Sequence, residues 1–174
     1  MNGGLGITGR NLRDNPYWLN FIFFGAMYLV SYRTNLGAGA TLNLQLKTPP
    51  DKLIHILSRQ LKAKGQTVEM ELIKEPTITD GDNEVIPQNM DDRFTKESDL
   101  IIYDNPTNVS GGTVKSINVA YGATQGNVTS SALFEDPEIE RVLGQDMDYV
   151  ITITNEGGSA TDVMFNILFY ESGN

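Results

Sequence analysis

The chain contains no cysteine and only one histidine among its 174 residues. Without cysteine it has no disulfide framework, no thiolate metal site and no thiol nucleophile. A single histidine, His55, excludes metal sites built from several imidazoles and pairs of histidine bases. We therefore expect no hydrolytic metal chemistry, no bound metal and no other cofactor.

The sequence also has little that suggests a membrane or a secretory route. Its longest apolar stretch, residues 18–32, is shorter than the roughly 18–20 residues that a spanning helix needs, and Asn20, Gly25 and Ser31 interrupt it. The first residues show neither a charged segment nor an apolar run of the kind found in secretory signals. We expect a soluble, non-secreted protein that does not enter a membrane.

The length suits one domain, because a chain of this size buries roughly 70% of its extended surface on folding. Its charge is divided unevenly along the sequence. Residues 1–65 contain eight Lys and Arg against two Asp and Glu, a balance of +6, whereas the remainder has five against twenty, or −15. This division predicts a basic N-terminal third that meets a partner and an acidic body that faces solvent.

Alternation of apolar and polar residues with period two recurs along the chain and predicts β-strands. About eight such segments are present, separated by clusters of Gly, Pro, Asn and Asp: 27–33, 41–47, 52–61, 67–73, 100–103, 114–121, 149–154 and 163–170. We read the last two as an antiparallel hairpin. Eight short strands predict an all-β, two-sheet antiparallel sandwich of jelly-roll type.

The N-terminal part reads differently. Residues 1–14 contain four glycines together with Arg10 and Arg13, which predicts an extended arm. Asn15 and Pro16 form a good helix start and Gly25 a plausible stop, so residues 17–24 are a short helix or, alternatively, a strand. We therefore divide the chain into an arm and apolar segment, 1–25, and a sandwich domain, 26–174. A second short helix is expected to start at 136–137 and run through 142.

No residue pattern in the chain defines catalytic or metal chemistry. The acidic stretch from Asp80 to Glu84 lacks the spacing of a calcium loop, and whether residues 80–92 bind calcium stays open. The adjacent Asp91 and Asp92 do not amount to two positioned carboxyl groups. His55 lies in an apolar strand, where a partly buried or surface histidine satisfied by a hydrogen bond is the ordinary outcome. We therefore expect no enzymatic activity.

Basic and aromatic residues of the N-terminal third are the candidates for binding a partner. The densest basic cluster is not accompanied by the exposed aromatic platform typical of single-strand nucleic-acid binding, so we expect no nucleic acid partner. The aromatic concentration in residues 17–24 is part of the core, a lid over one open end of the sandwich, or an anchor buried at a subunit interface. The candidate residues are Arg10, Arg13, Tyr17, Trp18, Phe21, Lys47, Lys52, Arg59, Lys62 and Lys64.

Several segments in order resemble jelly-roll structural proteins of tailed bacteriophage virions. They are 42–48, Glu69-Met70-Glu71-Leu72, Glu75-Pro76-Thr77-Ile78-Thr79-Asp80-Gly81, Ile86-Pro87-Gln88-Asn89-Met90, Tyr149-Val150-Ile151-Thr152-Ile153-Thr154-Asn155 and Ile167-Leu168-Phe169-Tyr170-Glu171. The resemblance covers residues 26–171, is closest to capsid decoration, or cement, proteins, and carries no catalytic motif.

The resemblance implies a protein on the outer surface of the virion head that binds the major capsid protein and links its neighbouring subunits. A different class is a tail-fibre or baseplate module that binds a host receptor or glycan through its long loops. Because edge strands of sandwiches commonly pair, a homodimer or homotrimer is also expected.

Overall fold

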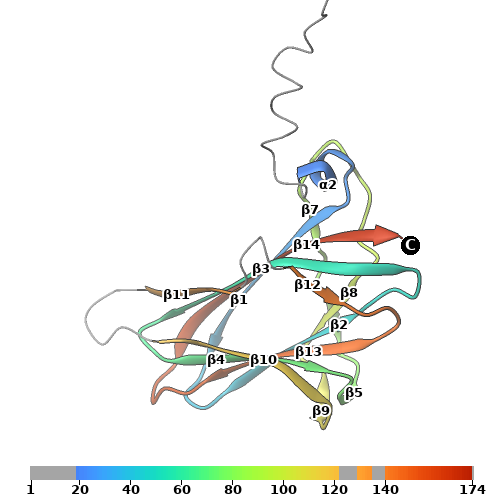
Figure 1. Cartoon of the computed structure of the whole chain (residues 1–174). Helices are drawn as coiled ribbons and strands as arrows, with labels where there is room; N and C mark the ends of the chain where they lie inside the picture. The colour runs from blue at the N-terminus through green and yellow to red at the C-terminus, as the bar shows by residue number, and fades with distance from the viewer. Residues whose placement is uncertain (1–18, 122–128, 135–139, 174) are drawn as a thin grey trace, which may run out of the picture.

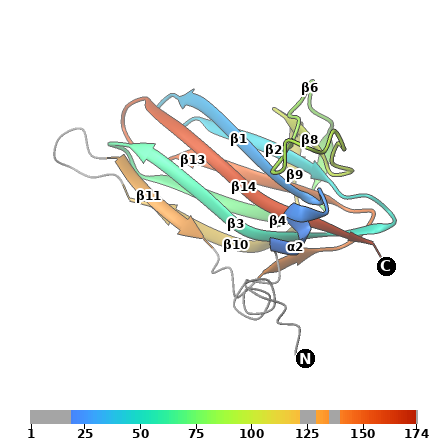
Figure 2. The same ribbon diagram turned by 90° about the horizontal axis from the view of Figure 1, so that it is seen from above.

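The computed structural model describes residues 19–121, 129–134 and 140–173, and these form two large antiparallel sheets packed as a sandwich, with a separate two-stranded sheet of β5 and β9. Sheet A has the strand order β11-β3-β14-β1-β7, with β12 also paired to β3, and sheet B has the order β10-β4-β13-β2-β8-β6. Figure 1 shows the two layers, and Figure 2 shows β11, β3, β14 and β1 running side by side. The elements are α2 (Leu19–Phe23), β1 (Met27–Leu36), β2 (Thr41–Lys47), β3 (Lys52–Lys64), β4 (Val68–Lys74), β5 (Thr77–Thr79), β6 (Asn83–Glu84), β7 (Gln88–Asn89), β8 (Ile101–Asp104), β9 (Thr107–Ser110), β10 (Thr113–Ala120), β11 (Thr129–Phe134), β12 (Arg141–Leu143), β13 (Asp148–Asn155) and β14 (Thr161–Gly173).

The strands pair as if one long hairpin had been folded and rolled up. The first long strand pairs with the last, β1 with β14, and the next inward pairs are β2 with β13, β3 with β12 and β11, and β4 with β10. Sheet A thus contains β1-β14-β3-β11 and sheet B contains β2-β13-β4-β10. This nested order is that of a jelly roll, and the all-β sandwich predicted from alternation is confirmed.

The core lies between the sheets, and the alternating side chains fill it. Val163, Phe165, Ile167 and Phe169 of β14 are buried against residues of sheet B, while Met164 and Leu168 lie on the outer face. Because successive side chains of a strand point to opposite faces, a period of two was sufficient to identify the inner face.

The closing hairpin predicted from the last two alternating segments is wrong. β13 pairs with β2 and β4 in sheet B, whereas β14 pairs with β1 and β3 in sheet A. The residues between them therefore cross from one sheet to the other. Alternation determines which face of a strand is buried, but it carries no information about which strand lies beside it.

The two helix predictions have different outcomes. In the N-terminal segment, α2 occupies residues 19–23, so the helical alternative holds in the described part, while residues 15–18 lie outside it. The second expected helix is wrong at its described end, because Arg141 and Val142 belong to β12 and pair with Ile56 and His55. Residues 136–139 lie outside the described residues.

A bulge in β3 changes which side chains of that strand face the core. Leu168 lies opposite Ser58 but Phe169 lies opposite Ile56, so Leu57 is an extra residue without a cross-strand partner in this pair. One extra residue shifts the alternation by one, and every later side chain changes face. His55 consequently points outward, whereas Arg59 points into the sandwich and is only 1% exposed.

Candidate attachment site

Helix α2 is fixed on the outer face of sheet A, near the end of β14. The ring of Phe21 stacks on Tyr170 with the centroids 3.9 Å apart. Together with Ile22 it packs against a small apolar cluster of Met27, Leu57 and Tyr170, separate from the main core. The helix is therefore held by side-chain packing, which short helices need because their own hydrogen bonds stabilise them only marginally.

Gly25 ends the helix and turns the chain into β1. Its φ angle is +63°, and its N–H donates to the Ile22 carbonyl at 2.9 Å, while the Ala26 N–H donates to the Phe21 carbonyl at 2.8 Å. These two bonds form a Schellman motif, in which glycine is preferred at the left-handed position. The ring of Phe94 packs directly on Gly25, where a Cβ atom would lie 2.4 Å from Cγ of that ring.

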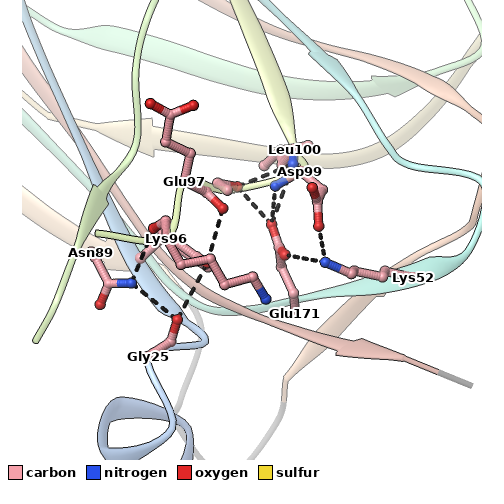
Figure 3. Close-up of polar contacts among 10 residues, drawn as sticks. Gly25, Lys52, Asn89, Lys96, Glu97, Asp99, Leu100 and Glu171 are labelled. Carbon is pink, nitrogen blue, oxygen red and sulfur yellow. Dashed lines mark hydrogen bonds and ion pairs between the residues drawn. The ribbon is translucent and has the colours of Figure 1, made fainter. Parts of the chain in front are cut away.

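Polar contacts fix the loop that follows β7 against the start of β1 (Figure 3). The Tyr28 hydroxyl lies 3.2 Å from the Glu97 carbonyl oxygen and 3.3 Å from that of Gly25. Asn89 Nδ2 donates to the carbonyl oxygens of Gly25 at 3.0 Å and Lys96 at 3.3 Å. Burial, and secondarily the charge of Glu171, raises the pKa of Tyr28 to about 12. The hydroxyl therefore remains a hydrogen-bond donor across the neutral range.

Glu171 is the second anchor of this loop. Its Oε1 accepts hydrogen bonds from Ser98 Oγ at 2.7 Å, the Asp99 N–H at 2.7 Å and the Leu100 N–H at 3.3 Å. Its Oε2 lies 3.3 Å from Lys52 Nζ, which also pairs with Asp99 (Figure 3). The Glu171 side chain is only 1% exposed, so the carboxylate is stabilised by donors and a cation instead of by water.

Around this anchored region, four large apolar side chains remain exposed. Phe23 and Phe24 are 59% and 75% exposed, and Met90 and Phe94 are 41% and 37% exposed. Phe23 and Phe24 directly precede Gly25, Phe94 packs on it, and the Met90 N–H donates to the Met27 carbonyl at 2.9 Å, so all four residues lie at the same end of the molecule. We call these four residues the end patch. Exposed apolar clusters on a fixed framework are typical of binding surfaces.

The predicted N-terminal candidates contribute to this region unequally. Arg10, Arg13, Tyr17 and Trp18 lie outside the described residues. Phe21 is half-buried and anchors the helix to the sheet, so its ring is largely used within the molecule. Sequence reasoning left Met90 and Phe94 out, since they lie in a polar segment without periodicity.

The five basic candidates do not form one cluster. Lys47 lies on β2 of sheet B, where Nζ is 2.9 Å from Asp80 Oδ2. Lys52 and Lys64 are the two ends of β3, separated by roughly 40 Å at about 3.3 Å per residue. Between them, Lys62 lies on the outer face, opposite Met164.

Arg59, the remaining member of that cluster, is not on the surface. Its guanidinium reaches across the sandwich from β3 to β10, and Nη1 and Nη2 each lie 3.2 Å from Ser116 Oγ. With an exposure of 1%, the side chain has no surface to offer a partner in this structure.

The acidic loops contain ion pairs and hydrogen bonds. A hydrogen bond from Gln45 and the ammonium group of Lys47 lower the pKa of Asp80. Hydrogen bonds from Arg93 lower the pKa of Asp91 to about 2. Within residues 19–121, 129–134 and 140–173, no group of three or more acidic or histidine side chains is placed to hold a metal ion.

Comparisons with known proteins add no identification. No family model matches the chain, and no curated protein matches it. Among the described residues there is no helix with the length and apolar character needed to cross a membrane.

Proposed function

We propose that this chain is a structural protein of a tailed-phage virion that binds the outside of the head and stabilises it, a role that requires no enzymatic step. In this role it links neighbouring subunits of the major capsid protein. The observation that carries the proposal is the end patch: exposed aromatic side chains on a jelly roll, next to a glycine-rich segment with basic residues. The resemblance to capsid decoration proteins supplies the identity of the partner.

The end patch alone is too small to hold the protein on a particle. The surface that its four side chains expose is about that of two fully exposed side chains. Burying this surface against a partner contributes roughly 3–6 kcal/mol to the free energy of binding. Association costs about 4–15 kcal/mol in lost translational and rotational freedom. Additional contacts are required, and we assign them to residues 1–18, which contain Arg10, Arg13, Tyr17 and Trp18.

The distribution of charge supports attachment through the N-terminal segment, where Arg10 and Arg13 favour contact with an acidic partner surface. The other basic candidates contribute less, because Lys47 and Lys52 are paired with carboxylates and Arg59 is buried. The net charge of −15 in residues 66–174 favours exposure of that part to solvent. Many copies on one symmetric shell multiply a modest interaction per copy, since linked sites bind with high effective concentration.

The decisive experiment measures occupancy on purified phage capsids assembled without this chain. Replacing Phe23 and Phe24 together by serine should weaken binding at least tenfold, because both exposed rings are lost. The matched control replaces Val114 and Ile117 of β10, which are 48% and 56% exposed, in the same way and should bind normally. Equal binding by all three proteins would refute attachment through the end patch.

Two further measurements separate the parts of the proposal. Deletion of residues 1–14 should lower the occupancy of the protein on capsids. Unchanged occupancy would show that these residues do not contribute to attachment. Binding to host cells or to a glycan array, without binding to capsids, would instead support the tail-fibre or baseplate alternative. Light scattering of the purified protein tests the expected dimer or trimer.

A further inference from the structure

Three polar side chains far apart in the sequence meet on the outer face of sheet A. His55 Nε2 lies 2.7 Å from Ser172 Oγ, and His55 Nδ1 lies 3.0 Å from Glu140 Oε1. Antiparallel pairing of β3 with β14 sets Tyr170 opposite His55, so Ser172 lies two residues further along the same face of β14. Glu140 immediately precedes β12, the neighbour of β3 on its other side.

The chemistry of the three groups determines where the protons lie. A carboxylate only accepts hydrogen bonds, so the contact with Glu140 requires a proton on His55 Nδ1. In the neutral ring, Nε2 then carries the lone pair, and the Ser172 hydroxyl must donate its proton to it. The Ser172 hydroxyl therefore donates its hydrogen bond to His55 Nε2, and the Glu140 carboxylate determines which tautomer the His55 ring adopts.

The rest of the cluster holds the base in this orientation. Tyr170 stacks on the His55 ring at 4.4 Å with an interplanar angle of 9°, and Phe21 of α2 stacks on Tyr170. The Tyr170 hydroxyl donates to Glu140 Oε2 at 2.8 Å, so both oxygens of that carboxylate are engaged. Fixed orientation of a base by a second, hydrogen-bonded group is what activates a serine nucleophile.

We propose that Ser172 is a reactive nucleophile that accepts an acyl group from small activated esters, with His55 as its general base and Glu140 as a positioning residue. Ser172 Oγ attacks the ester carbonyl carbon as its proton moves to His55 Nε2. The carbon–oxygen bond to the leaving alcohol then breaks, and the alcohol receives that proton. Water attacks the acyl-serine by the same route, which releases the carboxylic acid and restores the hydroxyl.

The accessibility of the cluster defines the class of substrate. The side chain of His55 is 12% exposed and that of Glu140 is 26% exposed, and Ser172 is half-buried beside them. Because Tyr170 covers one side of the His55 ring and little of the cluster is exposed, the substrate we propose is an acetyl-sized acyl group on a good leaving group. The inference is independent of attachment to a capsid, because neither Ser172 nor His55 belongs to the end patch.

The sequence contains no motif that indicates the contact of His55 with Ser172 and Glu140. His55, Glu140 and Ser172 are separated by 85 and 32 positions and match no catalytic motif. The expectation that His55 is a partly buried, hydrogen-bonded side chain is confirmed. Only the jelly-roll pairing identifies its partners as a serine and a carboxylate.

The test uses the intact protein with a fluorophosphonate probe and with p-nitrophenyl acetate. In the probe reaction the Ser172 oxygen forms a bond to phosphorus, the phosphorus–fluorine bond breaks, and the proton passes to His55. Peptide mapping should locate the label on Ser172, and Ser172→Ala should lose both the label and the ester hydrolysis. His55→Gln should slow labelling by about 100-fold or more, since general bases contribute that much.

The control is Ser31→Ala, which removes an exposed serine on β1 of the same sheet and should leave labelling unchanged. Thermal unfolding of each variant separates loss of reactivity from loss of fold. Label spread over many serines, or the same labelling in Ser172→Ala as in the parent, would overturn the proposal. The serine comparison decides the question even if His55→Gln does not fold.

Discussion

Gly25 offers a direct test of how the end patch is built, because two separate costs of adding a side chain can be measured there. Its φ is +63°, a conformation in which an L-residue costs roughly 1–2 kcal/mol. Alanine recovers about 0.4–1 kcal/mol by restricting the unfolded chain, so the backbone cost is about 1 kcal/mol. A Cβ atom would also lie 2.4 Å from Phe94 Cγ, so that ring must move.

Gly39 is the matched control. Its φ is +67° and nothing lies within 4 Å of its Cβ position, so Gly39→Ala should cost only the backbone part, about 1 kcal/mol. Phe94 is 37% exposed, and losing about half of a buried ring's contribution adds roughly 1 kcal/mol in Gly25→Ala. The variant should thus lose about 2 kcal/mol of unfolding free energy.

Urea unfolding followed by circular dichroism measures both variants, and a double-mutant cycle isolates the contact. In a Phe94→Ala background, Gly25→Ala should cost no more than Gly39→Ala does, since the ring that obstructs the Cβ is absent. Equal destabilisation by Gly25→Ala and Gly39→Ala in the parent protein would refute the close packing of Phe94. It would also remove the physical basis for treating the end patch as one rigid surface.

Two further predictions concern the polar anchors of the same end. Glu171→Ala should lower the free energy of unfolding by roughly 3 kcal/mol, because buried donors and a cation lose their acceptor, and hydrogen exchange should accelerate at Asp99 and Leu100. The exposed Glu156→Ala should change stability by less than about 0.5 kcal/mol, and equal effects of the two would contradict the anchoring role. The pKa of Tyr28 is raised from 10.0 to about 12, so the folded state keeps a proton that the unfolded chain loses. The free energy of unfolding should therefore fall as the pH rises from about 10 to about 12. Denaturant titrations should show a smaller fall for Tyr28→Phe, and an identical fall would refute the raised pKa of Tyr28.

The eight predicted segments correspond to β1, β2, β3, β4, β8, β10, β13 and β14, whereas β11 was missed. Alternation was clearest in strands that bury one whole face. In β2, for example, Leu42, Leu44 and Leu46 are all buried in the main core, and the predicted range 41–47 is the observed one. Four short strands between β4 and β10, namely β5, β6, β7 and β9, were not found, since segments such as Asn83–Glu84 and Gln88–Asn89 bury no apolar face and contain no period. They form because neighbouring strands offer free edges to pair with.

The candidate partner site was only partly accessible to sequence reasoning. The concentration of aromatic residues near the N-terminus pointed to the segment that contains the exposed Phe23 and Phe24, although Phe21 was the candidate chosen from the described part of that segment. The basic cluster was assembled from neighbours in sequence, yet the bulge at Leu57 moves Arg59 to the interior. A bulge is a property of the pairing between two strands, so no periodicity within β3 alone could reveal it.

The nested pairing of strands has a consequence for how the chain is made. β14 lies between β1 and β3, and its ten register partners on β1, from Met27 to Leu36, precede it by more than a hundred residues. During synthesis on the ribosome, β1 and β3 emerge early but cannot be joined, because the strand that belongs between them has not yet been translated. Sheet A therefore closes only after almost the whole described chain has left the ribosome. Until then, β1 and β3 are unpaired along the edges that β14 later joins.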